Sequence, residues 1–206
     1  MYRLYWRYDS GAYTPNALLE LCGARFERIH VDSHQGETRR AEYLALNPLA
    51  QIPTLVLPDG TVMTESAAMI LHLTESFPSA GLAPGPDSAE RPRFLRWLLF
   101  LATNTYPTEL RVTYPGRVTA DAAGAAAVLA QARTDKARLW RVYSDALVDR
   151  DWMVGSRMSA VDIYAAMLAG WWADRATIPA IAALVDRVRE NPVCGRLWEE
   201  YEIRAV

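Results

Sequence analysis

An acidic side chain stands directly before a hydroxyl side chain at Glu65 and Ser66, where an amphipathic segment begins. The backbone N–H groups at the start of a helix, together with the Ser66 hydroxyl, make an anion site that suits a free carboxylate. Glu65 beside them is suited to hold an ammonium group through a charge-assisted hydrogen bond. The pair therefore predicts a site for a ligand end that carries both charges.

The dipeptide Ile52-Pro53 is a candidate cis peptide bond, because the cis form costs far less before proline than elsewhere. A cis bond would turn the backbone of Ile52 outward, so that its N–H and C=O groups pair with an extended peptide as an added strand does. Gln51 can hydrogen-bond the backbone of such a ligand without adding charge. These residues predict that a short peptide docks here.

The elements that must position these residues follow from the local patterns of the first 78 residues. A run of aromatic and β-branched residues predicts a strand, and proline or glycine marks the helix ends. The expected elements are strand 2–6, a helix with Pro15 in its first turn that runs to about residue 22, strand 26–31, short helix 41–46, strand 54–57, strand 62–63 and an amphipathic helix that ends at about residue 77. The order βαβ and then ββα predicts a small α/β domain.

The composition changes after Pro78. Residues 79–88 hold Pro84, Gly85 and Pro86, which neither continue a helix nor build a core. Beyond them every pattern is helical, and residues 159–162 match the capping box [ST]-x-x-[DE] before an apolar run. The expected helices cover residues 94–102, 120–147, 160–172, 178–188 and 192–201. We therefore expect an α/β domain over 1–78, a linker over 79–88 and an all-α domain over 89–206.

Residues 47–53 read Asn-Pro-Leu-Ala-Gln-Ile-Pro, and the Glu65-Ser66 pair follows after a turn. This arrangement resembles the glutathione transferase family, which has N-P-x-G-Q-V-P and then a D/E-S pair at the start of the next helix. The likeness covers nearly the whole chain, including the linker and the capping box. It implies a thioredoxin-like first domain that binds glutathione and a helical second domain that forms a pocket for an electrophilic co-substrate.

In such a protein a hydroxyl near the start of the first helix hydrogen-bonds the sulfur of glutathione. A donor hydrogen bond and a helix N-terminus both lower the pKa of a thiol and so raise the thiolate fraction at neutral pH. Ser10 is the first candidate, because it lies in the turn as the active serine does in the serine-type members. Tyr13 is the second candidate, because one small gap in the alignment of this chain with the family would put it in the active position. Tyr8 is the third.

The resemblance also implies contacts to the rest of glutathione. Glu65 and Ser66 fit its γ-glutamyl end, and Gln51, Ile52 and Pro53 fit its peptide backbone. His34 or Arg39 is placed to reach the glycine carboxylate from a loop. The alternation of His30, Asp32 and His34 could supply metal ligands, but polar alternation at a strand end is typical of a solvated face, so we expect no metal site.

Cysteine-type members carry Cys in the turn where this chain has Gly11 and Ala12. No mixed disulfide with the protein can form at that point, which disfavours glutaredoxin-like chemistry. Cys22, at the end of the first helix, is interpreted as a buried apolar residue. Ala50 replaces the usual Gly of the motif. We expect no cofactor beyond glutathione, which acts as co-substrate.

Aromatic and guanidinium side chains follow the first long helix of the second domain. They are Tyr106, Arg111, Tyr114 and Arg117. In the family this region walls the electrophile pocket, where aromatic faces and guanidinium groups suit a flat, electron-poor or anionic molecule. We therefore expect a hydrophobic or electrophilic small molecule as the second substrate.

Composition excludes several classes of partner. The 206 residues include 22 Lys and Arg against 24 Asp and Glu, a formal charge of −2 without a basic stripe, so nucleic acid is not expected. The apolar runs are too short to span a bilayer, and the start of the sequence has no signal-peptide pattern. We expect a cytoplasmic protein, and the resemblance implies a homodimer.

Three functions are compatible with these residues. The first is a transferase, in which bound glutathione, as a thiolate, attacks an electrophilic carbon. The second is a glutathione-dependent disulfide reductase or peroxidase that uses no cysteine of the protein. The third is a non-catalytic binding module that keeps the fold and does not need the hydroxyls of Ser10 and Tyr13.

Overall fold

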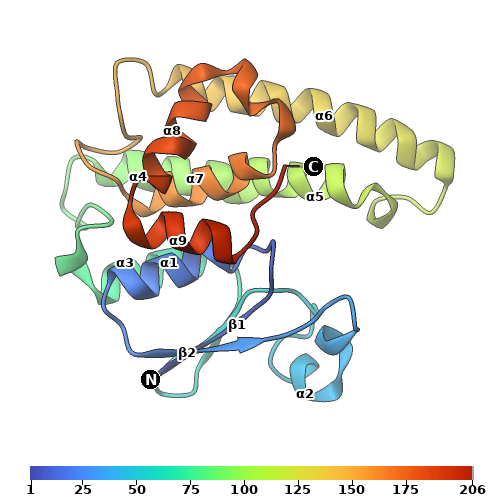
Figure 1. Ribbon diagram of the computed structural model, residues 1–206, viewed down its shortest axis with the longest axis horizontal. Coiled ribbons are helices and arrows are strands. Elements are labelled where there is room, and N and C mark those ends of the chain that lie inside the picture. The colour runs from blue at the N-terminus through green and yellow to red at the C-terminus, as the bar shows by residue number, and fades with distance from the viewer. Residues whose placement is uncertain (206) are drawn as a thin grey trace. The chain divides into compact units, whose positions relative to one another are not determined.

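The computed structural model describes residues 1–205, which form two compact units (Figure 1). The first unit comprises Met1–Asp87 together with Arg189–Ile203. The second unit comprises Ser88–Val188 and the residues from Arg204 onward. The last helix of the chain therefore belongs to the first unit, whereas the sequence pattern alone assigns it to the helical domain over 89–206.

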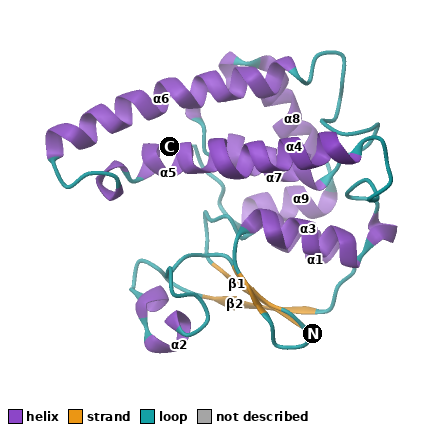
Figure 2. Cartoon of the chain, turned by 180° about the vertical axis from the view of Figure 1, so that it is seen from behind, coloured by secondary structure: helices purple, strands orange, loops and turns teal. Residues whose placement is uncertain are grey.

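The first unit is built on a four-stranded mixed sheet, whose strands are orange in Figure 2. The strand order is β2-β1-β3-β4, with β1 parallel to β2 and antiparallel to β3, and with β3 antiparallel to β4. The strands are β1 (Tyr2–Trp6), β2 (Phe26–His30), β3 (Thr54–Val56) and β4 (Val62–Met63). The predicted βαβ and ββα order is confirmed.

The helices of the first unit bury apolar side chains that recur at helical spacing. They are α1 (Tyr13–Leu21), α2 (Ala41–Leu44), α3 (Ser66–Ser76) and α9 (Pro192–Glu200), with the 3₁₀ turns η1 (Glu37–Arg39) and η2 (Pro78–Ala80). Leu18 and Leu19 of α1 and Met69 and Ile70 of α3 are fully buried. Pro15 lies in the first turn of α1, where proline is tolerated.

Aromatic contacts explain why α9 belongs to the first unit. The ring of Tyr13 on α1 meets the rings of Trp198 and Tyr201 edge-on, at centroid distances of 5.8 and 5.9 Å. A Cβ atom on Gly195 would lie 2.3 Å from the carbonyl oxygen of Arg189, so only glycine fits at this point of α9. Contacts between residues far apart in the sequence thus join α9 to the first unit.

The second unit is helical throughout its regular elements. They are α4 (Arg91–Phe100), the π-helical segment η3 (Leu101–Thr105), α5 (Tyr106–Thr113), η4 (Pro115–Arg117), α6 (Ala122–Asp145), α7 (Ala160–Gly170), η5 (Ala173–Thr177) and α8 (Pro179–Arg189). Helix α5 is not among the predicted elements. Pro107 lacks an N–H group to donate to a helical hydrogen bond, and the wider π-helical segment lies directly before α5.

Helix α7 lies at the core of the second unit, and all of its residues are buried. Its predicted capping box is present, since the Ser159 backbone N–H and hydroxyl both donate to Oδ2 of Asp162, at 2.8 and 2.7 Å. In Figures 1 and 2, α5 and α6 run side by side within this unit. A buried ion pair of 2.6 Å joins them, from Lys136 to Glu109.

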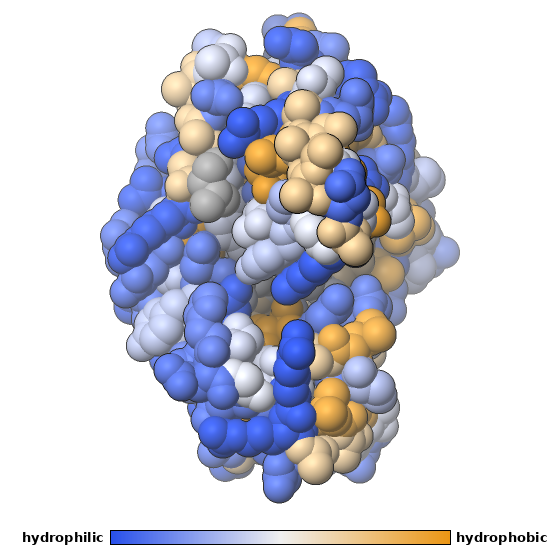
Figure 3. All heavy atoms as spheres, turned by 90° about the vertical axis from the view of Figure 1, so that its right-hand side faces the viewer, coloured by the Kyte–Doolittle hydropathy of each residue, from blue (hydrophilic) through white to orange (hydrophobic). Residues whose placement is uncertain are grey.

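Hydrophilic residues cover most of the molecular face in Figure 3, and apolar residues form small separate patches there. Such scattered exposure is usual for a folded domain. Among residues 1–205, no helix has the length and apolar character that crossing a membrane requires.

Candidate functional site

The loop from Asn47 to Pro53 is held by a buried polar network. The Tyr43 hydroxyl and the Asn47 amide both donate to the carbonyl oxygen of Gln51, at 2.6 and 2.9 Å. Both groups also contact the Thr54 hydroxyl, at 2.9 and 3.2 Å. The Ile52-Pro53 peptide bond that follows is cis. The network thus fixes the backbone that presents Gln51 and Ile52.

Ala50 lies in the left-handed region of backbone conformation, with φ of 55°. Glycine adopts this conformation without the steric cost that a Cβ atom imposes. The position therefore explains on physical grounds why a glycine is usual in this motif. Ala50 donates its N–H to the Asn47 carbonyl at 2.9 Å, which helps to hold the turn in this chain.

Glu65 and Ser66 lie at the start of α3. Glu65 has φ of 65° and ψ of 108°, an unusual conformation for a residue with a side chain, and its carboxylate is exposed. Ser66 is half-buried, and no side chain caps the helix N-terminus. Backbone strain of this kind gathers at ligand sites, where surrounding structure holds it in place. The uncapped N–H groups are available to an anion.

Strand pairing brings three segments to one end of the sheet. Leu55 pairs with Met63 in antiparallel register, so the segment before β3, which holds Pro53, and the segment after β4, which holds Glu65, leave the sheet at the same end. Tyr5 pairs with Thr54, so the end of β1 and the turn after it, which holds Ser10, lie at this same end of the sheet. The sheet therefore gathers the cis-proline loop, the start of α3 and the Tyr8–Tyr13 turn, although they are separate in the sequence.

The Ser10 hydroxyl is almost buried within this turn. It donates to the Arg7 carbonyl at 2.7 Å, and it is approached by the Ala12 N–H at 3.4 Å. Ser10 precedes α1, whose N-cap residue Ala12 has no side-chain cap. A hydroxyl proton rotates freely about its C–O bond, so this donor can be redirected to a stronger acceptor.

The other two catalytic candidates have different surroundings. Tyr13 is fully buried, and its hydroxyl donates to the Cys194 carbonyl at 3.0 Å. Burial raises the pKa of Tyr13 well above its ordinary value. Tyr8 is 48% exposed, and its ring packs against Trp6 and His30 at centroid distances of 5.1 and 5.3 Å. The Tyr13 hydroxyl is thus engaged in the interior, whereas the Ser10 hydroxyl lies in the turn directly before α1 with a donor that can be redirected.

His34 and Arg39 are exposed in the loop after β2. The ring of His34 lies 3.5 Å from a guanidinium nitrogen of Arg7. The Asp32 carboxylate accepts the backbone N–H groups of His34 and Gln35, at 2.8 and 3.2 Å, and so shapes the turn. Within the described part of the chain, no three His, Cys, Asp or Glu residues are arranged to hold a metal ion.

The four predicted residues of the electrophile pocket lie on α5 and just after it. Tyr106 stacks on Tyr164 at 6.3 Å and meets Trp171 edge-on at 5.8 Å. The Arg117 guanidinium lies 3.8 Å from the centre of the Tyr114 ring, and Arg111 is exposed on the last turn of α5. An aromatic face and two exposed cations are thus present in the second unit.

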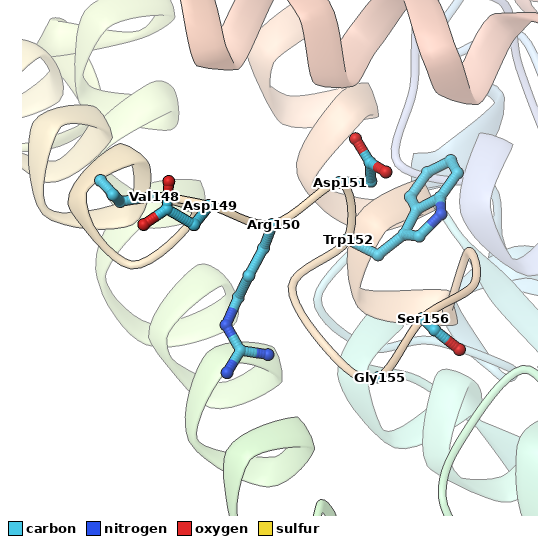
Figure 4. A pocket seen from close by; sticks show the side chains of 7 residues that line it. All are labelled: Val148, Asp149, Arg150, Asp151, Trp152, Gly155 and Ser156. Carbon is cyan, nitrogen blue, oxygen red and sulfur yellow. The ribbon is translucent and has the colours of Figure 1, made fainter.

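A separate cavity of about 490 Å³ lies in the connection between α6 and α7 (Figure 4). Its lining is formed by Val148, Asp149, Arg150, Asp151, Trp152, Gly155 and Ser156. Arg187 crosses to this connection and bonds Asp151, with its guanidinium 5.4 Å from the Trp152 ring. None of the predicted site residues lines this cavity, and its lining is more polar than apolar.

Two groups of residues at the site were not predicted to have a role. Tyr43 and Thr54 hold the cis-proline loop, and the only local signal was Asn47, a residue type that often starts such turns. Tyr201 donates toward Asn16 at 3.2 Å, behind the Ser10 turn. No local pattern marks Tyr201, because its partners are distant in the sequence.

A mixed sheet with a cis-proline loop, followed by a helical unit, defines a thioredoxin-like protein with an added helical domain. Two family models match: the N-terminal domain of glutathione S-transferase over residues 14–76 and its C-terminal domain over residues 105–192. The chain belongs to the glutathione S-transferase family.

Several proteins are similar to this chain. The uncharacterized GST-like protein YncG of Escherichia coli K12 is 30% identical over 200 residues, which cover 94% of this chain and 95% of that protein. Glutathione S-transferase GstA of E. coli O157:H7 is 27% identical over 92% of this chain and 94% of its own. A sphingomonad glutathione S-transferase, solved in complex with glutathione, has a TM-score of 0.85 at 26% identity and covers 97% of this chain and 98% of its own.

Proposed function

We propose that this chain is a glutathione transferase that activates the thiol of glutathione for attack on an electrophilic carbon. The observation that carries the proposal is the strained Glu65 at an uncapped helix start directly after β4, together with the cis Pro53 directly before β3, the antiparallel neighbour of β4. Family membership and the glutathione complex of a similar structure support it.

Each part of glutathione has a partner in this proposal. Glu65 holds the ammonium group of the γ-glutamyl end, and Ser66 with the first N–H groups of α3 holds its carboxylate. The backbone of Ile52 pairs with the cysteinyl residue, beside Gln51 and Pro53. The loop residues His34 and Arg39 neutralise the glycine carboxylate.

Ser10 stabilises the thiolate. Its hydroxyl proton leaves the Arg7 carbonyl and turns to the sulfur, because a hydrogen bond to a charged acceptor is stronger than one to a neutral carbonyl. The positive end of α1 acts in the same direction on the pKa of the thiol. The thiol proton of glutathione is released to solvent, the sulfur lone pair of the thiolate forms the bond to carbon, and the leaving group departs with its electron pair. Tyr106, Arg111, Tyr114 and Arg117 bind the electrophile.

Calorimetric titration with glutathione tests the binding part. Ser66→Ala removes one bond to the carboxylate, so we expect about 10-fold to 100-fold weaker binding, as hydrogen bonds to charged groups contribute about 1.5–3 kcal/mol. Ser76→Ala, at the opposite end of α3, is the matched control and retains wild-type affinity. Absence of binding heat for the wild-type protein would overturn the transferase proposal.

Turnover with a set of electrophiles tests the catalytic part. Ser10→Ala lowers kcat and leaves the affinity for glutathione nearly unchanged, because the hydroxyl acts on the thiolate. Tyr13→Phe has a much smaller effect on kcat, since the Tyr13 hydroxyl is committed to the Cys194 carbonyl. A larger loss in Tyr13→Phe than in Ser10→Ala would reverse these two assignments.

A further inference from the structure

The turn that holds Ser10 is bound on both sides by one residue from the far end of the chain. The backbone N–H of Asp9, just before Ser10, donates to the carbonyl oxygen of Tyr201 at 2.6 Å. The hydroxyl of Tyr201 reaches the carbonyl of Ala12 at 3.4 Å and the side-chain oxygen of Asn16 at 3.2 Å. Tyr201 thus contacts the chain before Ser10, after it, and one helical turn further on.

Asp9 shows why this turn needs an external support. Its φ of 45° is in the left-handed region, which costs free energy for a residue with a Cβ atom. Such a conformation persists only where surrounding contacts hold it. The bond from Asp9 to Tyr201 is one of those contacts, so the position of the Ser10 backbone depends on Tyr201.

The Tyr201 side chain is itself firmly placed. It is fully buried, and its ring packs on Trp6 at 4.8 Å and on Tyr13 at 5.9 Å. Asn16, which receives its hydroxyl, donates in turn to Glu20 at 2.9 Å, and Glu20 forms an ion pair with Arg196 of α9. A chain of polar contacts therefore ties α1 to α9 on both sides of Tyr201.

We propose that Tyr201 is a positioning residue for the Ser10 hydroxyl. Tyr201, at the end of α9, thereby influences the pKa of a bound thiol. The inference rests on the proposed function. A hydrogen bond to a thiolate depends on distance and direction, and small displacements of a catalytic group reduce rates strongly. Loss of the Tyr201 hydroxyl loosens the Ala12–Asn16 side of the turn without removing any group that touches glutathione.

Tyr201→Phe tests this inference in the full-length protein, because it removes only the hydroxyl and keeps the ring and the backbone bond. The thiolate of bound glutathione is followed by its ultraviolet absorbance as a function of pH, beside kcat and the calorimetric affinity. We expect the pKa of the bound thiol to rise by about one, which lowers the thiolate fraction at neutral pH by at most about tenfold. We expect kcat to fall in parallel, whereas the affinity for glutathione changes less than about twofold.

Tyr143→Phe is the matched control. Tyr143 is also fully buried, and its hydroxyl has no hydrogen-bond partner among the described residues. This variant keeps the wild-type thiolate titration. Asn16→Ala is a second variant that removes the acceptor of the Tyr201 hydroxyl, and it shifts the titration in the same direction as Tyr201→Phe.

The outcomes separate the inference from the function on which it rests. A wild-type thiolate titration in both Tyr201→Phe and Asn16→Ala overturns the inference alone. A parallel loss of affinity and kcat in Tyr201→Phe also overturns it, because it indicates general loosening of the unit. Wild-type protein that binds glutathione without lowering the pKa of its thiol overturns the proposed function and this inference with it.

Discussion

Cys22 and Cys194 are free thiols; Cys194 is buried, whereas Cys22 is half-buried and not buried as the sequence predicts. Burial raises the pKa of Cys22 to about 11 and that of Cys194 to about 12. The thiolate is the reactive form of cysteine, so neither residue is a competent nucleophile under ordinary conditions. At neutral pH both thiols therefore stay protonated, and neither supplies a thiolate of the protein.

This protonation predicts slow alkylation. At pH 7, we expect iodoacetamide to modify Cys22 far more slowly than it modifies free glutathione. The rate at Cys22 should rise with pH up to about pH 11, and Cys194 should react more slowly still. Mass spectrometry of the modified protein measures both rates. The variants Cys22→Ser and Cys194→Ala should retain thiolate formation on bound glutathione. Fast alkylation of Cys22 at neutral pH would contradict this prediction and revive a cysteine-based mechanism.

At the scale of single elements, the capping box of α7 is a short motif that stabilises the fold more strongly because it is buried. The Asp162 carboxylate is fully buried and accepts the Met153 N–H at 2.8 Å, in addition to the Ser159 groups. Burial raises the pKa of Asp162, and these hydrogen bonds act in the opposite direction. The motif therefore fixes both the start of α7 and the chain segment before it.

Replacement of this cap should be costly. Asp162→Ala leaves the buried N–H groups of Met153 and Ser159 without acceptors, so we expect the free energy of unfolding to fall by about 3–5 kcal/mol. Asp121→Ala is the control: Asp121 caps α6 through Gly124 at 2.6 Å but is exposed, and we expect a loss of about 1 kcal/mol. Urea unfolding measures both values, and equal losses would show that burial does not matter here.

At the scale of the whole molecule, several buried acids predict sensitivity to alkali. The ordinary pKa is 9.0 for a cysteine and 10.0 for a tyrosine, and burial raises the pKa of Cys22, Cys194, Tyr13 and Tyr201 above these values. The folded chain therefore holds these protons more tightly than the unfolded chain. Their contribution to stability is complete below about pH 9 and is lost as the pH rises through the folded-state values.

Urea unfolding between pH 7 and pH 11 checks this expectation. These groups should leave the free energy of unfolding nearly constant up to about pH 9. Above that pH, each group should lower it by at most about 1.4 kcal/mol per pH unit. The double variant Cys194→Ala, Tyr13→Phe should show a shallower decrease. An unchanged slope in that variant would assign the alkaline loss to other groups.

The amino-acid sequence by itself determined the features that depend on neighbours in the chain. These are the strands and most helices, the loop at Gln51–Pro53, the Glu65-Ser66 helix start and the capping box of α7. Each follows from backbone preferences and hydrogen bonds within a few residues, which local patterns encode. Helix α5 escaped prediction because Pro107 reads as a break, although proline is tolerated in a first helical turn.

Only the tertiary structure decided which hydroxyls are buried and which segments meet. The sequence ranks Ser10 before Tyr13 but leaves both open, whereas packing of α9 on α1 commits the Tyr13 hydroxyl to the Cys194 carbonyl. The same packing brings Tyr201 to both sides of the Ser10 turn. Such contacts arise from burial of apolar surface between distant segments, which is non-directional and leaves no local signature in the chain.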